Sequence, residues 1–568
     1  MLINRHYKKN SILINIVVTP WILLLLLTFL VHGLVLINNG IYWDGALIYA
    51  FQKSHNITML REWFFNSGLP PTYYLHKFLW LFNSQLIYNI IGFFSVYCTG
   101  FLAYKIAKLY QNIPQTTAIL IGAITITFPG SMLTFFRILT PCYICMVLFM
   151  LASYCGLIAV NFKSKLTSIT LRIVSLILFF ASFAIQSFLV YFSIFFICLY
   201  IVFCNKNKRN LMSFSSLLNF CINYFDFLAL PFVFKFLTRV YFKTAGVYKN
   251  YNTIDINKLK LHFLNWYSQS LHQGILFYFK DVFNPWILIF IITVSIILII
   301  RNRAHKCPLN TKPIQLKTHL FLIALGIIAV LLAIFPYVLV GKPIASQADF
   351  LSSRYALLIP LSTSLIIAGI IGLTIRYKYT KTIAILFTAF LLLTFTKTWW
   401  QNYLSLSAMS ASQKAAIKFV KTHPQFAKYR ICWLKQKKLP LILHPGYRRY
   451  GLSNLWNNYQ AKNSKIVITN ILPLTLRSIC SKTNQLRCNY ADIDLKGSQA
   501  DLTLSSKYTN KDIIKLNLQY IYYRFFNKKK LDAFLENIIN IQVTPSASKI
   551  NLALLCYNYI HKIPAKKD

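Results

Sequence analysis

The chain has 568 residues, and hydrophobic side chains make up 56% of them. Its mean hydropathy of +0.52 excludes an ordinary soluble enzyme and is typical of an integral membrane protein. Only 13 Asp and Glu stand against 60 Lys and Arg, which gives a formal net charge of +47. The sequence contains no Walker motif, so we do not expect ATP hydrolysis.

Apolar runs of roughly 18 to 25 residues recur along the first 400 positions, the length that crosses a bilayer as a helix. The first run ends near Ile37, is too long for a signal peptide and precedes no small-residue cleavage site, so it predicts a retained helix. We expect an all-α polytopic membrane domain, residues 1–400, with about eleven transmembrane helices. The expected helices lie near residues 12–37, 85–109, 115–132, 139–161, 168–184, 187–204, 213–238, 286–300, 318–340, 355–375 and 383–400. The end of the seventh run is alternatively an interfacial amphipathic helix.

Basic residues set the orientation of these helices, because cytoplasmic loops are enriched in Lys and Arg. With the N-terminus inside, the inside loops carry 18 Lys and Arg and no carboxylate. The short outside loops hold only Arg137, Lys342, Asp349 and Arg354 as charged residues. We therefore expect a cytoplasmic N-terminus, and an odd number of helices puts the C-terminal region outside.

The first outer loop, residues 38–84, is too long for a simple turn. It contains Asp44, within the sequence Ile-Tyr-Trp-Asp-Gly that follows the first apolar run. Carboxylates close to lipid are costly and are usually retained for function, and only six precede residue 401. Asp44 is therefore the candidate catalytic residue. A helix-like segment, residues 46–55, follows it.

Two further outer loops carry aromatic and basic residues. The loop at 241–285 contains Trp266 and several Lys and His side chains. The loop at 341–355 places Lys342 and Arg354 on adjoining helix ends, where Arg as a fork and Lys as a point charge are suited to grip a phosphate. The alternative is that both side chains only reach out to lipid headgroups, as most basic residues at helix ends do.

Residues 401–568 contain no spanning run and are expected to form a small soluble α/β domain. Helix-like segments occur at 412–421 and 529–539, and alternating or β-branched ones at 466–471 and 514–523. The region has 27 Lys and Arg against 7 Asp and Glu. Beside a bilayer this favours anionic headgroups or phosphorylated ligands. The alternative is a composition bias, because Lys, Asn and Ile are frequent throughout the chain.

The motifs together carry a family resemblance. An Asp after the first helix, a long outer loop and then Pro70-Pro71-Thr72-Tyr73-Tyr74 leading into the second long span resemble the GT-C fold of polytopic glycosyltransferases. The closest patterns are those of the aminoarabinose transferases and the protein O-mannosyltransferases. Arg137-Ile138-Leu139-Thr140-Pro141 is similar to a second motif of that family. The resemblance covers roughly residues 12–200 and rests on short motifs.

Three positions depart from the family pattern. The paired acid usually found after the first Asp is Gly45 here, the Asp expected after Thr-Pro is Cys142, and the Lys often found before Pro-Pro is Leu69. Glu62 is a possible second carboxylate, although its spacing does not match. The chemistry therefore needs Asp44 alone, or catalysis has been lost.

The resemblance implies transfer of a sugar from a polyprenyl-phosphate donor to a glycan, lipid or protein acceptor at the outer face of a membrane, expected to be a bacterial inner membrane. It implies Asp44 as the base or acceptor-orienting carboxylate. Membrane lipids are expected partners; nucleic acid, metal ions and cofactors are not. The alternatives are a transporter or flippase for lipid-linked saccharides and a non-catalytic subunit. The expected substrate-binding residues are Arg354, Lys342, Arg137, Tyr73, His76 and Glu62.

Overall fold

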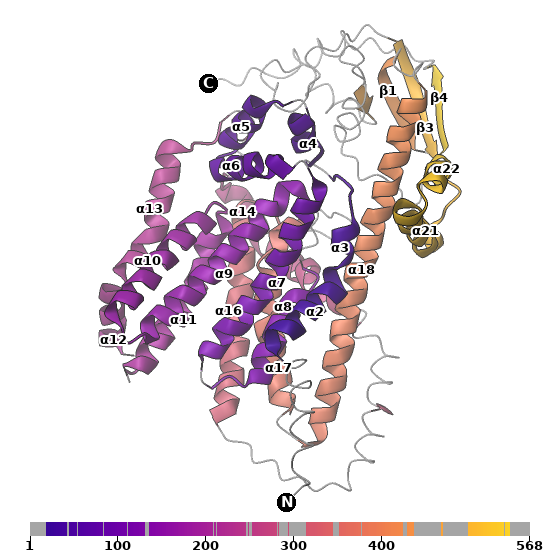
Figure 1. The fold of residues 1–568 in the computed structure, drawn as a ribbon. Helices are drawn as coiled ribbons and strands as arrows, with labels where there is room; N and C mark the ends of the chain where they lie inside the picture. Colours follow the sequence, from indigo (N-terminus) through magenta and orange to yellow (C-terminus); the bar gives the residue numbers. More distant parts are fainter. Residues whose placement is uncertain are drawn as a thin grey trace, which may run out of the picture.

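The computed structural model describes the protein over defined stretches of the chain, which are mostly helical (Figure 1). These stretches are residues 19–42, 45–53, 55–82, 84–110, 112–130, 136–207, 209–211, 213–245, 248, 253–280, 282, 293–294, 314–344, 352–375, 378–423, 429–436, 467–469, 498–538 and 540–545. Asp44 and the expected helix at 286–300 fall outside them, apart from Thr293 and Val294.

Six described helices are long and apolar enough to cross a membrane. They are α7 (Gln85–Leu109), α9 (Thr140–Asn161, extended at its start by the 3-10 turn η2, Arg137–Leu139), α10 (Lys165–Ser182), α11 (Ser187–Lys206), α16 (Ile314–Leu339) and α18 (Lys378–Thr422). Three shorter apolar helices accompany them: α2 (Pro20–His32), α8 (Gln115–Thr127) and α17 (Ile359–Ile375). The chain is thus a membrane protein by its helices, and these coincide with expected spans.

The seventh expected span is a bent pair of helices. α12 (Phe214–Asn223) and α13 (Phe225–Tyr241) pass the length and hydropathy test only together, and they meet at an angle of 61°. Asp226, in the first turn of α13, accepts a hydrogen bond from Nε of Arg172 on α10 at 2.6 Å. This ion pair connects the start of α13 to α10. The carboxylate of Asp226 is therefore neutralised by Arg172.

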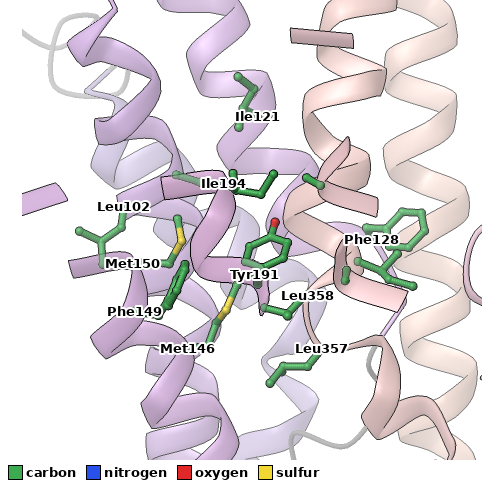
Figure 2. Close-up of a cluster of buried hydrophobic side chains, with 14 of the residues drawn as sticks. Leu102, Ile121, Phe128, Met146, Phe149, Met150, Tyr191, Ile194, Leu357 and Leu358 are labelled. Carbon is green, nitrogen blue, oxygen red and sulfur yellow. The ribbon is translucent and has the colours of Figure 1, made fainter. Parts of the chain in front are cut away.

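The transmembrane core is built from aromatic and aliphatic side chains of several helices (Figure 2). Phe149 and Met150 of α9 lie close to Tyr191 of α11 in this cluster. The Tyr191 hydroxyl is also within hydrogen-bond distance of Ser362 Oγ on α17, at 2.9 Å. Burial of a phenol among apolar groups requires such a partner. The bond therefore links α11 to α17 across the core.

Small residues allow α16 and α17 to approach closely. A Cβ on Gly326 would lie 2.9 Å from the backbone nitrogen of Ile366, and one on Gly369 would lie 2.9 Å from the carbonyl oxygen of His319. Neither position has room for a larger residue without moving a helix. Close backbone approach through Gly is a common basis of helix association in membranes, where lipid offers no hydrophobic driving force.

Three short helices cover one end of the membrane helices, as Figure 1 shows. They are α4 (Gly45–Lys53), α5 (Ile57–Asn66) and α6 (Pro70–Leu79), so the helix expected at 46–55 is confirmed. Pro70 and Pro71 stand in the first turn of α6, where a missing N–H costs nothing. A separate apolar cluster, which includes Phe51, Trp63 and Tyr73, holds the three helices together.

α18 is a single helix of 45 residues, which corresponds to roughly 68 Å at 1.5 Å per residue. It continues without a break past Trp399 and Trp400, where the sequence predicted the end of the last membrane helix and the start of a soluble domain. Both indoles anchor it: Trp399 Nε1 donates to the carbonyl of Thr127 at 2.9 Å, and Trp400 Nε1 to that of Leu30 at 2.8 Å. The helix expected at 412–421 is the far end of this same helix.

Beyond α18 the described strands form one four-stranded sheet in the order β2-β1-β3-β4. Its strands are β1 (Tyr429–Gln436), β2 (Val467–Thr469), β3 (Ser498–Ser505) and β4 (Asn540–Pro545). β1 is parallel to both β2 and β3, and β4 is antiparallel to β3. The strand expected at 466–471 is confirmed by β2.

Two helices, α21 (Ile513–Phe526) and α22 (Lys528–Ile538), connect β3 to β4. The helix expected at 529–539 is confirmed by α22. The alternating pattern at 514–523 favoured a strand, but the structure has the helix α21 there. Its apolar residues fit a period of two and a helical period equally well. A capping box between Thr509 and Asp512 starts the 3-10 turn η7 (Asn510–Asp512), which leads directly into α21. Burial of Leu516 and Tyr520, four residues apart, fixes the helical period.

Candidate functional site

The candidate site is centred on Arg137, which precedes α9 and is only 2% exposed. Its guanidinium donates through Nε to Gln85 Oε1 and through Nη1 to Gln52 Oε1, the latter at 3.1 Å. The rings of Tyr49 and Tyr88 lie 5.3 and 4.9 Å from its Cζ atom. Among the described residues no carboxylate lies within ion-pair distance of it. A buried cation whose described partners are all neutral is suited to an anionic ligand, which would neutralise its charge.

The two glutamines around Arg137 are themselves held in place. Gln52 Nε2 donates to the carbonyl of Trp80 at 3.3 Å, and Gln85 Nε2 donates to Asn89 Oδ1 at 3.0 Å. Each amide nitrogen is thus turned to a fixed acceptor, which leaves the amide oxygen to face the guanidinium. Asn89 in turn donates to the carbonyl of Val35 at 3.0 Å. The network therefore joins Arg137 to the end of the first membrane helix.

His76 lies beside Arg137 on the inner face of α6 and is completely buried. Its Nδ1 is 3.3 Å from the Tyr88 hydroxyl, and its ring stacks on Phe64 with a centroid distance of 5.1 Å. Burial, and then the charge of Arg137, lower the pKa of His76 to about 3. His76 is therefore neutral at physiological pH. Its Nε2 is buried and has no hydrogen-bond partner in the described part of the chain.

The segment around Asp44 is described on both sides, although Asp44 itself lies outside the described residues. Tyr42 is buried, and its hydroxyl donates to the carbonyl of Leu406 on α18 at 2.6 Å. A Cβ on Gly45 would lie 3.4 Å from Cβ of Arg137. The chain on one side of the candidate base is thus fixed to α18, and on the other it packs against Arg137.

Lys342 and Arg354 form a second basic group at the end of α16. Gly341 ends this helix with a φ of +67°, a conformation that favours glycine, and Lys342 follows directly. Burial, and then the nearby charge of Arg354, lower the pKa of Lys342 to about 8. Arg354 stacks on the ring of Tyr355, with 4.7 Å from its Cζ atom to the ring centroid. The two cations are thus close enough to act on each other.

Both basic groups lie near the N-terminal end of α9. Arg137 stands in the turn that opens it, and Arg354 interacts electrostatically with Cys142 in its first turn. Thr140, the first residue of α9, is 1% exposed, and its hydroxyl has no hydrogen-bond partner within the described stretches. Helix N-termini attract anions through their free N–H groups and their dipole. The arrangement suits a negatively charged ligand at this end of α9.

Two of the predicted site residues lie apart from the Arg137 group. Tyr73 is 5% exposed and belongs to the apolar cluster of α4, α5 and α6. Glu62 is exposed on α5, and no contact joins it to Arg137 among the described residues. Trp266, which lies in the segment 241–285 on α14 (Ile256–Gly274), packs against Gly341, next to Lys342.

The sequence did not indicate the residues that surround Arg137: Tyr49, Gln52, Gln85 and Tyr88. Gln52 and Gln85 are 85 and 52 positions from Arg137 along the chain. Polar residues at apolar helix ends are a weak signal, because such residues usually serve as caps or face water. Only the folded arrangement reveals that both amides point at one guanidinium.

Comparison with known proteins gives no match to a family model, a curated protein or a solved structure. No group of three or more His, Cys, Asp or Glu side chains in the described residues is placed to hold a metal ion. Cys480 and Cys488, which the sequence allows to pair, lie outside the described residues.

Proposed function

We propose that this chain is a GT-C type glycosyltransferase that moves a sugar from a polyprenyl-phosphate donor to a glycan, lipid or protein acceptor. The observation that carries the proposal is the buried Arg137, whose described partners are all neutral. The phosphodiester that joins the lipid to the sugar would supply a negative charge at the level where α9 begins. Arg matches the geometry of phosphate oxygens with two parallel N–H donors.

In the proposed reaction, the bond between the sugar C1 and the phosphate oxygen breaks and polyprenyl phosphate leaves. A bond forms between C1 and an acceptor oxygen, and the acceptor proton passes to the carboxylate of Asp44. Arg137, assisted by Lys342 and Arg354, stabilises the charge that develops on the leaving phosphate. Packing of Gly45 against Arg137 supports this assignment, because Gly45 follows Asp44 directly in the chain.

The neutral state of His76 limits its role. With a pKa of about 3, it adds no positive charge to the phosphate site. Its Nε2, which has no hydrogen-bond partner among the described residues, is suited to a hydrogen bond with a hydroxyl of the sugar, which is the role we propose for it. Tyr73 packs in the same apolar cluster as Phe64, on which His76 stacks. For the exposed Glu62 we propose contact with an acceptor.

The proposal includes a topology with about eleven spans, a cytoplasmic N-terminus and residues 401–568 outside. We expect an alkaline phosphatase reporter fused at about residue 450 to be active and a green fluorescent protein at the same point to be dark, because the basic inside loops hold the opposite ends of the helices. The same reporters in the loop 301–317 provide the control and should give the reverse result. Fluorescence at residue 450 would contradict the eleven-span topology.

Donor binding should depend on pH through Lys342. In the free protein Lys342 has a pKa of about 8, and a bound phosphate would raise it. Affinity for the polyprenyl-phosphate sugar should therefore be full below pH 8 and decline as the pH rises through 8. In the Lys342→Arg variant the side chain stays charged over this pH range. The affinity of this variant for the polyprenyl-phosphate sugar should therefore stay constant. An equal decline in both proteins would exclude Lys342 as the cause.

An acceptor-dependent transfer assay tests the proposed function directly. The purified protein in lipid nanodiscs is given a panel of radiolabelled polyprenyl-phosphate sugars with glycan, lipid and peptide acceptors. The proposal expects labelled acceptor and release of polyprenyl phosphate with at least one donor. Movement of intact donor across the bilayer of reconstituted vesicles, without transfer, would support a transporter instead.

A further inference from the structure

α21 lies beside the middle of α18, at the height where the first membrane helix ends (Figure 1). Asn517 Nδ2 donates to the carbonyl of Leu404 at 3.0 Å, one turn beyond Trp400. The Tyr520 hydroxyl is 3.3 Å from Asn39 Oδ1, and Arg524 donates to the carbonyl of Ile37. Helices α2 and α3 (Leu34–Ile37) together extend over about 27 Å, close to the thickness of the hydrocarbon layer. α21 is therefore fixed at the end of the first described apolar helix, where a span formed by α2 and α3 would leave that layer.

The outward face of α21 is apolar, which reverses the usual pattern of a surface helix. Ile514, Leu518, Tyr522, Phe525 and Phe526 are 51% to 78% exposed. At 100° per residue they occupy one stripe of about 120°. The buried face instead contains the polar Asn517 between Leu516 and Tyr520. A helix that turned this stripe to water would expose five large apolar side chains side by side, which marks an interaction surface.

Lysines border this apolar stripe at both ends. Lys511 and Lys515 are exposed near the start of α21, and Lys528, Lys529 and Lys530 are exposed directly after its end. No ion pair involves any of these five lysines among the described residues. An apolar stripe with aromatic residues and a basic border is the pattern of helices that lie in the membrane interface.

We propose that α21 is an interfacial helix that docks on the surface of the same membrane, with its apolar stripe among the acyl chains and its lysines on anionic phospholipid headgroups. Three observations select this partner: the height of α21 at the end of the first span, the apolar stripe, and the complementary charge of the lysines. Attachment of α21 to the bilayer would hold α18 and the sheet beyond it at a fixed angle to the membrane. This inference is independent of the proposed glycosyl transfer.

Photo-crosslinking in the full-length protein tests this inference. p-Benzoylphenylalanine replaces Leu518 or Phe525 on the stripe, or Ala533 on the exposed side of α22 as the matched control. Each protein is placed in nanodiscs of phosphatidylcholine with phosphatidylglycerol, irradiated and analysed by mass spectrometry. We expect lipid adducts at Leu518 and Phe525 in severalfold higher yield than at Ala533.

A second variant tests the contribution of the lysines separately from that of the apolar stripe. Replacement of Lys528, Lys529 and Lys530 together by Gln should lower the yield of phosphatidylglycerol adducts at Leu518 severalfold, because each lysine near an anionic surface strengthens binding about fivefold. These side chains are exposed, so the variant should fold, and its thermal unfolding in detergent should match that of the parent. Adducts at Leu518 between two protein chains, or no adduct with lipid in either position, would overturn the proposal.

Discussion

Replacement of Arg137 by Gln is expected to lower sugar transfer by about 10²- to 10³-fold, because a preorganised donor at the leaving phosphate contributes roughly 2.7 to 4 kcal/mol in a dry site. Arg137 is 2% exposed and its described partners are neutral, so its charge acts in a medium that screens it poorly. Arg137→Lys should also lose most activity. An ammonium group cannot donate to both Gln52 and Gln85 while it stacks between two tyrosine rings.

A second prediction for Arg137→Gln distinguishes a functional role of Arg137 from a structural one. The described partners of Arg137 are all neutral, and a buried cation with only neutral partners costs stability, so Arg137→Gln should unfold at the same temperature as the wild type or higher when no donor is present. Stabilisation by added donor should then be lost. The measurement is thermal unfolding in nanodiscs with and without polyprenyl-phosphate sugar.

The control for this experiment is Arg61→Gln. Arg61 is exposed on α5, one of the three short helices that cover one end of the membrane helices, and it stacks on Phe65. Its loss should leave both transfer and donor stabilisation unchanged. If Arg137→Gln lowered the unfolding temperature and kept the donor response, Arg137 would be a structural residue and the proposed phosphate site would fail.

The membrane helices were predictable because an apolar run must satisfy its backbone as a helix in lipid. α7 begins and ends where the run of residues 85–109 does. The length of α18 was not predictable from hydropathy, because the apolar run stops near Trp400 while the helical period continues to Thr422. For α21 the apolar pattern allowed two periods, and the choice depended on the cap at Thr509 and on packing against α18.

The candidate site was predictable only in part. Arg137, Lys342 and Arg354 stood out as charges in short loops between apolar runs, and charge is visible in a sequence. It was not predictable that these three charged residues would lie close together near the start of α9. Their positions depend on where α16 ends and where α17 begins. The amide oxygens that face Arg137 come from α4 and α7. Such contacts between distant segments carry no signal in one sequence.

Asp44→Asn is expected to lower transfer by about 10²-fold or more, because a general base contributes 10² to 10⁴ and the amide cannot accept a proton. The substitution keeps the size of the side chain and its capacity for hydrogen bonds. Tyr42 and Gly45, which fix the flanking chain, are unchanged. Donor affinity should therefore remain close to that of the wild type, while the rate of transfer to an acceptor falls. The measurements are donor binding and single-turnover transfer on the same preparation.

A matched control is Glu62→Gln, because Glu62 is the other carboxylate of residues 38–84 and is exposed on α5. If Asp44 is the base, Glu62→Gln should affect acceptor affinity at most, and the single-turnover rate at saturating acceptor should stay unchanged. The pH dependence adds a further distinction: the acidic limb of the wild-type rate profile should disappear in Asp44→Asn, because that limb reports protonation of the base. An Asn variant with wild-type rate and an intact acidic limb would exclude Asp44 as the base. It would leave the transferase proposal dependent on Arg137 alone, which holds a donor phosphate but cannot remove a proton from an acceptor.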